Sequence, residues 1–314
     1  MPRSILSLLL VSFLTSAIEA KGTKYALLIG VSKYDPKQLD NLRFPEKDVT
    51  KLADVLVDSA GFQKKNVRLL TVSRAFALKE RRWMPIASSI RKELKLLARR
   101  AERDDTVIIA FAGHGVQFRG EKENYFCPAD ADLTNRKTLI GMKSEVYRLL
   151  DQQCDARVKL LFVDACRDDP RSKVGRGPKV NLQKLNNPQG LERPKGIAAF
   201  FSCKSGQEAF EHSDLGHGVF FHFVIEGLKG KARTKKGAVT LPSLKQYVKD
   251  SVIEFVDSKL NANQIPDLRE DSTDVITLVE PGESALVKEI TNSIGMKLRL
   301  IPAGTFMMGS PDSE

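Results

Sequence analysis

Cysteine, histidine and tryptophan are scarce in this chain: its 314 residues include four cysteines, four histidines and one tryptophan. Four cysteines are too few and too widely spaced to staple a small domain with disulfides, and none belongs to the C-x-x-C pair of a zinc ribbon. At least one thiol is therefore available for chemistry. The cysteines are Cys127, Cys154, Cys166 and Cys203, and the histidines are His114, His212, His217 and His222.

Long apolar runs are also missing, except near the start. Residues 5–14 are mostly apolar, but a stable transmembrane helix needs about 20 such residues. Arg3 precedes this run and small residues follow it up to Ala20, which is the pattern of a cleaved export signal. We therefore expect residues 1–20 to be a signal peptide and the protein to be exported to the periplasm, cell envelope or extracellular space. An uncleaved anchor is the alternative, and no further transmembrane span is predicted.

Acidic residues are outnumbered, because 39 Asp and Glu against 50 Lys and Arg give a net charge of +11. The excess is concentrated in Lys79–Arg103 and Lys229–Lys249, which we interpret as solvent-facing helix and loop surfaces. Neither cluster is interleaved with aromatic side chains or accompanied by a zinc finger, so nucleic-acid binding is not expected. Hydrophobic residues make up 42% of the chain, enough for one large domain or two smaller ones, which excludes a disordered protein.

From Lys24 onward, short apolar runs rich in β-branched residues alternate with longer segments of helical period. This rhythm is typical of βαβ units around a parallel sheet, and predicts an α/β fold with about six strands. Strands are predicted at 25–31, 67–70, 106–112, 158–163, 197–201 and 275–279. Helices are predicted at 46–60, 85–101, 143–154, 218–227 and 241–260.

One stretch interrupts this rhythm. Asp168–Pro194 is rich in proline, glycine and basic residues and has almost no apolar pattern, so it is predicted to be an exposed loop. It is either a solvated connector or, because it directly follows a reactive residue, a regulated or cleavable segment.

Two predicted strands end in residues that can do chemistry. The strand at 106–112 is followed by Gly113-His114-Gly115, and the strand at 158–163 by Asp164-Ala165-Cys166-Arg167. Open α/β sheets bind ligands at the carboxyl ends of their strands, so the imidazole and the thiol are expected at one edge. A histidine beside a cysteine can take its proton and leave a nucleophilic thiolate. A turn histidine without a catalytic role is the alternative for His114.

His114 precedes Cys166 by 52 residues, close to the spacing of about 50 residues in the caspase signature. With this spacing, the chain resembles the caspase and metacaspase clan of cysteine peptidases, in particular its bacterial members, over about residues 24–278. The matching segments are Tyr25–Val31 as first strand, Ala112–Gln117 around the histidine, Glu123–Ala131 after it and Asp164–Arg167 around the cysteine.

The resemblance implies a caspase-like three-layer sandwich, with a mostly parallel sheet and helices on both faces. It also implies an endopeptidase that acts on proteins or peptides, in which Cys166 attacks the peptide carbonyl and His114 is acid and base, with no essential third member of a triad. The backbone N–H groups of Gly115 and Cys166 would form the oxyanion hole.

The predicted specificity is for Arg or Lys at P1, the substrate residue before the cleaved bond. The segment Leu42–Asp48 resembles the metacaspase segment whose aspartate lines the S1 pocket. Asp164 stands where animal caspases have a glutamine that helps to bind an acidic P1 side chain. Two carboxylates in a partly desolvated pocket attract a cation and repel an aspartate. For Asp48 the alternative is a helix N-terminal residue favoured by the macrodipole.

The resemblance also bears on processing and metals. An enzyme of basic specificity could cleave its own loop after Arg171, Lys173, Arg176 or Lys179. Several metacaspases use calcium, but the paired-aspartate loop of that site is not visible at residues 130–143, and Asp168 and Asp169 are the nearest alternative. No cofactor is therefore predicted, while calcium activation stays open. His217 and His222 are assigned to a helix that packs on the sheet rather than to a metal site.

The C-terminal segment is expected to belong to a second domain. Asn292–Ser310 resembles the opening strand pair of the formylglycine-generating, sulfatase-modifying family, over about twenty residues that lack the catalytic cysteines of that family. The expected organisation is a signal peptide at 1–20, a peptidase domain at 21–280, and a linker with the start of this second domain at 281–314. An unrelated C-terminal β-hairpin is the alternative.

Two other functions stay open at this point. One is a non-catalytic caspase-fold module for binding or signalling in the cell envelope, and the other is a basic envelope protein that adheres through its positive surface. The presence of both His114 and Cys166 favours the peptidase. No oligomeric state is predicted.

Overall fold

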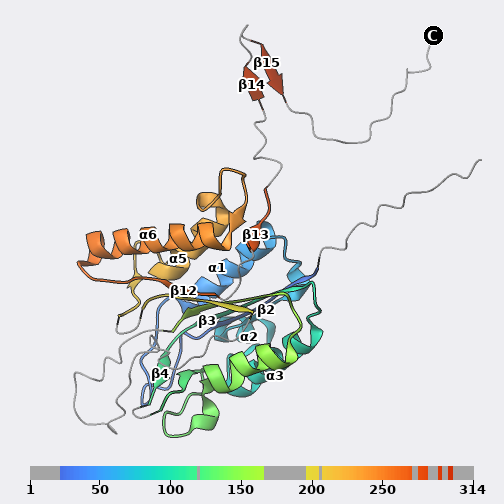
Figure 1. Cartoon of the computed structure of the whole chain (residues 1–314). Coiled ribbons are helices and arrows are strands. Elements are labelled where there is room, and N and C mark those ends of the chain that lie inside the picture. Colours follow the sequence, from blue (N-terminus) through green and yellow to red (C-terminus); the bar gives the residue numbers. More distant parts are fainter. Residues whose placement is uncertain are drawn as a thin grey trace, which may run out of the picture.

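The centre of the molecule is a six-stranded sheet in the order β12-β8-β7-β3-β1-β2 (Figure 1). The computed structural model describes residues 22–118, 121–165, 196–204, 207–270, 275–281, 289–291 and 296–299. All neighbouring strands of this sheet are parallel except β12, which runs antiparallel to β8. The strands are β1 (Lys24–Gly30), β2 (Val67–Leu70), β3 (Thr106–Ala112), β7 (Val158–Asp164), β8 (Ile197–Phe201) and β12 (Asp267–Arg269).

The central strands are buried on both faces, which explains their almost continuous apolar sequences. In β1, Leu27 and Ile29 pack into one apolar cluster, whereas Ala26 and Leu28 pack into a second cluster on the opposite face. Successive side chains of a strand alternate between the two faces of a sheet, and both faces here are covered by helices.

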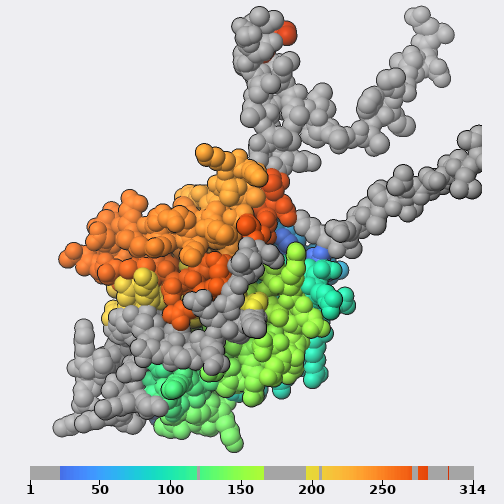
Figure 2. Space-filling model, viewed as in Figure 1, coloured from blue at the N-terminus to red at the C-terminus, as the bar shows by residue number. Residues whose placement is uncertain are grey.

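Helices cover both faces of the sheet. α1 (Pro45–Asp58), α5 (Val219–Glu226) and α6 (Leu241–Leu260) lie on one face, and α2 (Val72–Leu78), α3 (Ala87–Arg100) and α4 (Arg148–Gln153) on the other (Figure 1). In the space-filling view, the chain around α6 (orange) and the chain that follows α3 in the sequence (green) lie on opposite sides of the molecule (Figure 2). The expected three-layer α/β sandwich is therefore confirmed.

Shorter elements surround these layers. The short strands form an antiparallel sheet of β4 (Gly115–Gln117), β5 (Asn124–Phe126) and β6 (Ile140–Gly141), and the pairs β9 (Glu211–His212) with β10 (His217–Gly218), β11 (Val239–Thr240) with β13 (Thr277–Val279), and β14 (Glu289–Thr291) with β15 (Lys297–Arg299). The short helices are η1 (Lys64–Asn66), η2 (Arg81–Trp83), η3 (Arg136–Thr138), η4 (Met142–Tyr147) and η6 (Gly227–Lys231).

Five of the six predicted sheet strands are confirmed, and the sixth is wrong. The run at 275–279 contains β13, which pairs with β11 outside the main sheet. The edge position is taken by β12, where Leu268 is buried between the half-buried Asp267 and Arg269. Three residues with one buried side chain are too short a pattern to be recognised, whereas the apolar run at 275–279 looks like a strand of the core.

The predicted helices are confirmed with small changes, but among the described residues the α-helix α2 and several short helical turns were missed. α2 begins after Thr71, whose side-chain oxygen accepts a hydrogen bond from Arg74 N, and it ends at Lys79 in the left-handed conformation with φ of 54°. Seven residues give fewer than two turns of apolar periodicity, so the helix signal is weak. The predicted helix at 143–154 is divided into η4 and α4.

The terminal predictions have mixed outcomes. The expected signal peptide lies outside the described residues. β14 and β15 form an antiparallel pair, but β14 lies just before the segment 292–310 in which a strand pair was predicted, and only β15 lies within it. The resemblance of this segment to a sulfatase-modifying domain stays a prediction. Among the helices of the described ranges, none combines the length and the apolarity needed to cross a bilayer.

Gly30, the last residue of β1, sets the distance between the sheet and the start of α1. A Cβ atom there would lie 2.7 Å from the carbonyl oxygen of Pro45 and 2.9 Å from Cα of Glu46. Both are backbone atoms of the first turn of α1, so they cannot rotate away. The close approach fixes the first turn of α1 over the carboxyl end of the sheet.

The variant Gly30→Ala is expected to lower the free energy of unfolding by about 1–3 kcal/mol, because the added methyl group pushes α1 from the sheet. Urea unfolding of the purified chain measures this change. An unfolding free energy equal to that of the wild type would contradict the close approach of α1 to Gly30.

Candidate active site

His114 lies in the turn between β3 and β4, just past the carboxyl end of β3. It is buried, and its Nε2 atom lies 2.9 Å from the backbone carbonyl oxygen of Asp40. A carbonyl oxygen can only accept a hydrogen bond, so Nε2 carries the hydrogen. A neutral imidazole in this tautomer has its lone pair on Nδ1, which is the nitrogen that can take a proton from a thiol.

Tyr34 holds the backbone around His114. Its hydroxyl group accepts a hydrogen bond from His114 N at 2.9 Å and donates one to the carbonyl oxygen of Cys127 at 3.2 Å. The two rings also pack together, with centroids 5.0 Å apart. In addition, Cys127 N donates to the carbonyl oxygen of His114 at 2.9 Å. The histidine turn is thus fixed from two sides in the buried interior.

Gly113 has no room for a side chain. A Cβ atom at this position would lie 2.6 Å from the Tyr34 hydroxyl oxygen, and the residue has φ of 157°. Its backbone N donates to the carbonyl oxygen of Asp164 at 3.0 Å. The glycine therefore joins the histidine turn directly to the end of β7.

Cys166 itself lies outside the described residues, but the strand register defines where its segment begins. β3 and β7 pair from Thr106↔Val158 to Ala112↔Asp164. His114 and Cys166 each follow the last paired residues by two positions. β3 and β7 therefore end in register at the same edge of the sheet, and the placement of Cys166 beside His114 stays a prediction.

Asp164 and Asp48 lie on the same face of the sheet. Leu160 and Phe162 of β7 belong to the cluster under α1, α5 and α6, and the alternation along β7 assigns Asp164 to that face. Asp48 is in the first turns of α1, which pack over Gly30 at the same edge. The structure therefore places both predicted pocket carboxylates on one face at the carboxyl edge, Asp48 being 1% and Asp164 2% exposed.

Asp48 contacts a segment that is distant in the sequence. Its Oδ1 atom lies 2.7 Å from Nδ1 of His217, and Gly218 N donates to its two carboxylate oxygens at 3.3 and 3.2 Å. His217 and Gly218 form β10, and Gly218 is also the N-terminal cap of α5. No local pattern in the sequence marks this contact, because 169 residues separate its partners.

The environment of His217 favours the neutral imidazole. Burial disfavours the charged imidazolium and is the largest cause of the lowered pKa of His217, followed by the ammonium groups of Lys47, Lys229 and Lys51. Glu226 raises this pKa, but the sum of these effects leaves it at about 4. Burial lowers the pKa of His222 as well. Of the pair assigned to helix packing, His222 lies in α5, whereas His217 lies in β10.

The start of α1 is also joined to β9. Glu211 accepts hydrogen bonds from the backbone N atoms of Arg43 and Phe44 at 3.4 and 3.1 Å, and Arg43 Nη1 donates to Ser213 Oγ at 3.0 Å. With the Asp48 contacts, these bonds fasten the segment before α1 to the β9–β10 hairpin.

The remaining cysteines are poor nucleophiles. Cys127, Cys154 and Cys203 are buried and not in disulfides. Burial raises the pKa of the Cys127 and Cys154 thiols, so both stay protonated at neutral pH. Cys166 is therefore the best candidate among the four.

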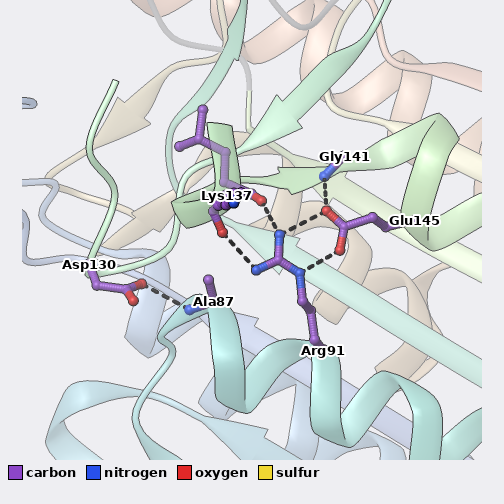
Figure 3. Close-up of polar contacts among 7 residues, drawn as sticks. Ala87, Arg91, Asp130, Lys137, Gly141 and Glu145 are labelled. Atoms are coloured by element: carbon purple, nitrogen blue, oxygen red, sulfur yellow. Dashed lines mark hydrogen bonds and ion pairs between the residues drawn. The ribbon is translucent and has the colours of Figure 1, made fainter. Parts of the chain in front are cut away.

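Polar contacts hold the segment after His114 against α3 (Figure 3). Arg91 on α3 donates from Nε and Nη2 to the carboxylate of Glu145 at 2.5 and 2.9 Å, and from Nη1 to the carbonyl oxygen of Lys137 at 2.8 Å. Asp130 accepts a hydrogen bond from Ala87 N at 2.8 Å. Asp132 accepts bonds from Thr134, and these bonds lower the pKa of its carboxyl group. These acids thus have structural roles in this segment.

Asp168 and Asp169, the alternative calcium ligands, lie outside the described residues, as do Arg171, Lys173, Arg176 and Lys179. Within the described ranges, no three His, Cys, Asp or Glu side chains converge as a metal site requires. Calcium activation and self-cleavage stay predictions.

The variant Tyr34→Phe tests the support of the histidine turn. It removes a buried hydroxyl group and leaves His114 N without its acceptor, so the free energy of unfolding is expected to fall by about 1–3 kcal/mol. The control is Tyr125→Phe, which removes a half-buried hydroxyl bonded to Glu121 and is expected to cost less. Chemical denaturation of both variants measures the difference, and equal losses would contradict the special role of Tyr34.

Acid stability tests the environment of His217. In the unfolded chain the ordinary pKa is 6.5, so between this value and about 4 the unfolded state binds more protons than the folded state. The contribution of His217 to the free energy of unfolding is therefore complete above pH 6.5 and is lost as the pH falls toward 4. The variant His217→Asn should show a shallower loss over this window in denaturation curves. The same slope in both proteins would contradict the depressed pKa.

Comparisons with known proteins agree with this architecture. The family model described as the caspase domain matches residues 23–276. Protein GSU0716 from Geobacter sulfurreducens has 15% sequence identity and a TM-score of 0.52, over 84% of this chain and 96% of that chain. Caspase-1 from Spodoptera frugiperda has 15% identity and a TM-score of 0.51, over 84% of this chain and 92% of that chain. No curated protein matches the chain.

At these identities the solved structures establish the fold, and the family model establishes the family because it covers most of the chain. The caspase-like sandwich expected from the strand rhythm and from the His114 and Cys166 motifs is confirmed. The chain belongs to the caspase-domain family.

Proposed function

We propose that this chain is a cysteine endopeptidase in which Cys166 is the nucleophile and His114 is the acid and base. The observation that carries the proposal is the hydrogen bond from His114 Nε2 to the Asp40 carbonyl oxygen, which leaves Nδ1 as the basic nitrogen at the edge where Cys166 follows β7. Membership of the caspase-domain family supports the same chemistry and supports proteins as substrates.

The proposed reaction has two steps. The Cys166 thiol gives its proton to Nδ1 of His114, and the thiolate attacks the peptide carbonyl carbon to form a tetrahedral intermediate. Backbone N–H groups of Gly115 and Cys166 stabilise the oxyanion, and the imidazolium then protonates the leaving amine as the C–N bond breaks. Water, deprotonated by His114, attacks the resulting thioester, and the thiol is regenerated as the acid product leaves.

The proposed specificity is for Arg or Lys at P1. Asp48 and Asp164 lie buried on one face at the carboxyl edge of the sheet, and in this proposal their carboxylates attract a guanidinium or ammonium group more strongly than they would in water. An acidic P1 side chain would be repelled by the same charges.

Processing and export are part of the same proposal. An enzyme of this specificity would cleave itself after Arg171, Lys173, Arg176 or Lys179, and the signal at residues 1–20 would direct it out of the cytoplasm. The parallel pairing of β7 with β8, which flank this segment in the sequence, would keep the cleaved pieces together.

The test is cleavage of fluorogenic peptides with Arg, Lys or Asp at P1, in the presence of reductant, with and without calcium. Cleavage after Arg or Lys is expected, and Cys166→Ala or His114→Ala should lower kcat/KM by about three orders of magnitude or more, because the pair acts as a unit. Cys154→Ala is the matched control, with activity retained.

Preference for Asp at P1 would contradict the acidic pocket. Cleavage that survives Cys166→Ala would contradict the nucleophile. Failure of every peptide with the folded protein would favour the non-catalytic binding module.

A further inference from the structure

We propose that His217 is a positioning residue, which orients the Asp48 carboxylate and preserves its negative charge, and so determines the preference for a basic P1 side chain. The inference rests on the proposed peptidase function and on the place of Asp48 in the S1 pocket. It adds the residue that controls this carboxylate.

The geometry around Asp48 is that of a carboxylate held by fixed donors. His217 Nδ1 lies 2.7 Å from Oδ1, and Gly218 N donates to both oxygens. The side chain of His217 is 13% exposed and that of Asp48 is 1% exposed. A buried carboxylate loses its hydration, and these hydrogen bonds replace it. Because the donors come from the backbone and from a packed ring, they also fix the direction of the carboxylate.

Two helix starts favour the ionised form of Asp48. Asp48 belongs to the first turns of α1, and Gly218 caps the N-terminus of α5. The N-terminal ends of helices carry partial positive charge and unpaired N–H groups, which stabilise a carboxylate. These positive helix ends and N–H groups offset part of the cost of burying a negative charge at Asp48.

The protonation state of His217 determines whether the Asp48–His217 pair presents a net negative charge to a substrate. A neutral imidazole donates from Nδ1 and leaves the net charge of the pair at −1, whereas an imidazolium would neutralise it. Burial and three ammonium groups oppose the second proton. The charged and titratable groups that face His217 are Asp48, Lys47 and Lys51 from α1, His222 and Glu226 from α5, and Lys229 from η6.

Neighbouring residues provide matched variants. An asparagine can place an amide N–H near the position of Nδ1, so His217→Asn keeps the donor, whereas His217→Phe keeps a ring but removes the donor. His222 lies beside His217, with ring centroids 6.1 Å apart, and the described contacts of its ring are with His217 and Phe223 rather than with a carboxylate. His222→Phe is therefore the control for a ring substitution in the same layer.

The first experiment measures kcat/KM for two peptides that differ only in Arg or Gln at P1. In His217→Phe the Arg-to-Gln ratio is expected to fall by about tenfold or more, mainly through KM for the Arg peptide, as for the loss of one hydrogen bond to a charged group. In His217→Asn and His222→Phe the ratio should stay close to that of the wild type. An equal loss for both peptides in His217→Phe would indicate a structural role and overturn the inference.

Asp48→Asn, measured in parallel, separates the two proposals. If this variant keeps the wild-type ratio, the S1 assignment of the proposed function fails, and the specificity role of His217 fails with it. If Asp48→Asn lowers the ratio while His217→Phe does not, the pocket stands and the role of His217 is overturned.

A second experiment does not depend on cleavage. ¹⁵N NMR of the full chain carrying Cys166→Ala reports the tautomer and charge of His217. The expected result at pH 7 is a neutral ring protonated at Nδ1, whose signal shifts in Asp48→Asn. An imidazolium at pH 7, or a neutral ring protonated at Nε2, would overturn the inference even if no peptide were cleaved.

Discussion

Parallel pairing of β1, β3 and β7 in one register is the constraint on which the candidate active site depends. It brings Gly30, Ala112 and Asp164 to a common row at the carboxyl edge of the sheet. The elements of the candidate active site come next to this row. α1 starts above Gly30, His114 follows Ala112 by two residues, and Cys166 follows Asp164 by two residues in the sequence. A slip of one strand by one residue would move all of its side chains to the opposite face and separate these groups.

Among the described contacts of His114, a backbone carbonyl oxygen binds the imidazole and one phenol ring packs against it. The Asp40 carbonyl oxygen fixes the tautomer, and Tyr34 fixes the main chain of His114. A carbonyl oxygen carries no formal charge, so it orients the ring without strongly stabilising the imidazolium. Carbonyl groups exist at every residue, and the side chain of Asp40 is not used, which is why no sequence motif marks this partner.

The net positive charge of the chain does not describe its candidate pocket. Although the protein has a net charge of +11, the Asp48 side chain is buried near the starts of α1 and α5 and lies 2.7 Å from Nδ1 of His217. Buried charges act over short distances with little screening, whereas surface lysines are solvated and screened. In the proposed S1 pocket, the local placement of carboxylates therefore matters more than the net charge of the chain.

The sequence by itself determined the α/β class, five of the sheet strands, and the two strand ends that carry His114 and Cys166. These features are local, because apolar runs and flanking glycines are contained within a few residues. The tertiary structure decided the edge strand β12, the short helix α2, and the partners Tyr34, Asp40 and His217. These depend on contacts between segments as much as 169 residues apart, for which a single sequence carries no periodic signal. Asp48 illustrates the difference between local pattern and tertiary contact. Its place at the start of a helix could be predicted from the sequence, whereas its contact with His217 forms only when the chain folds.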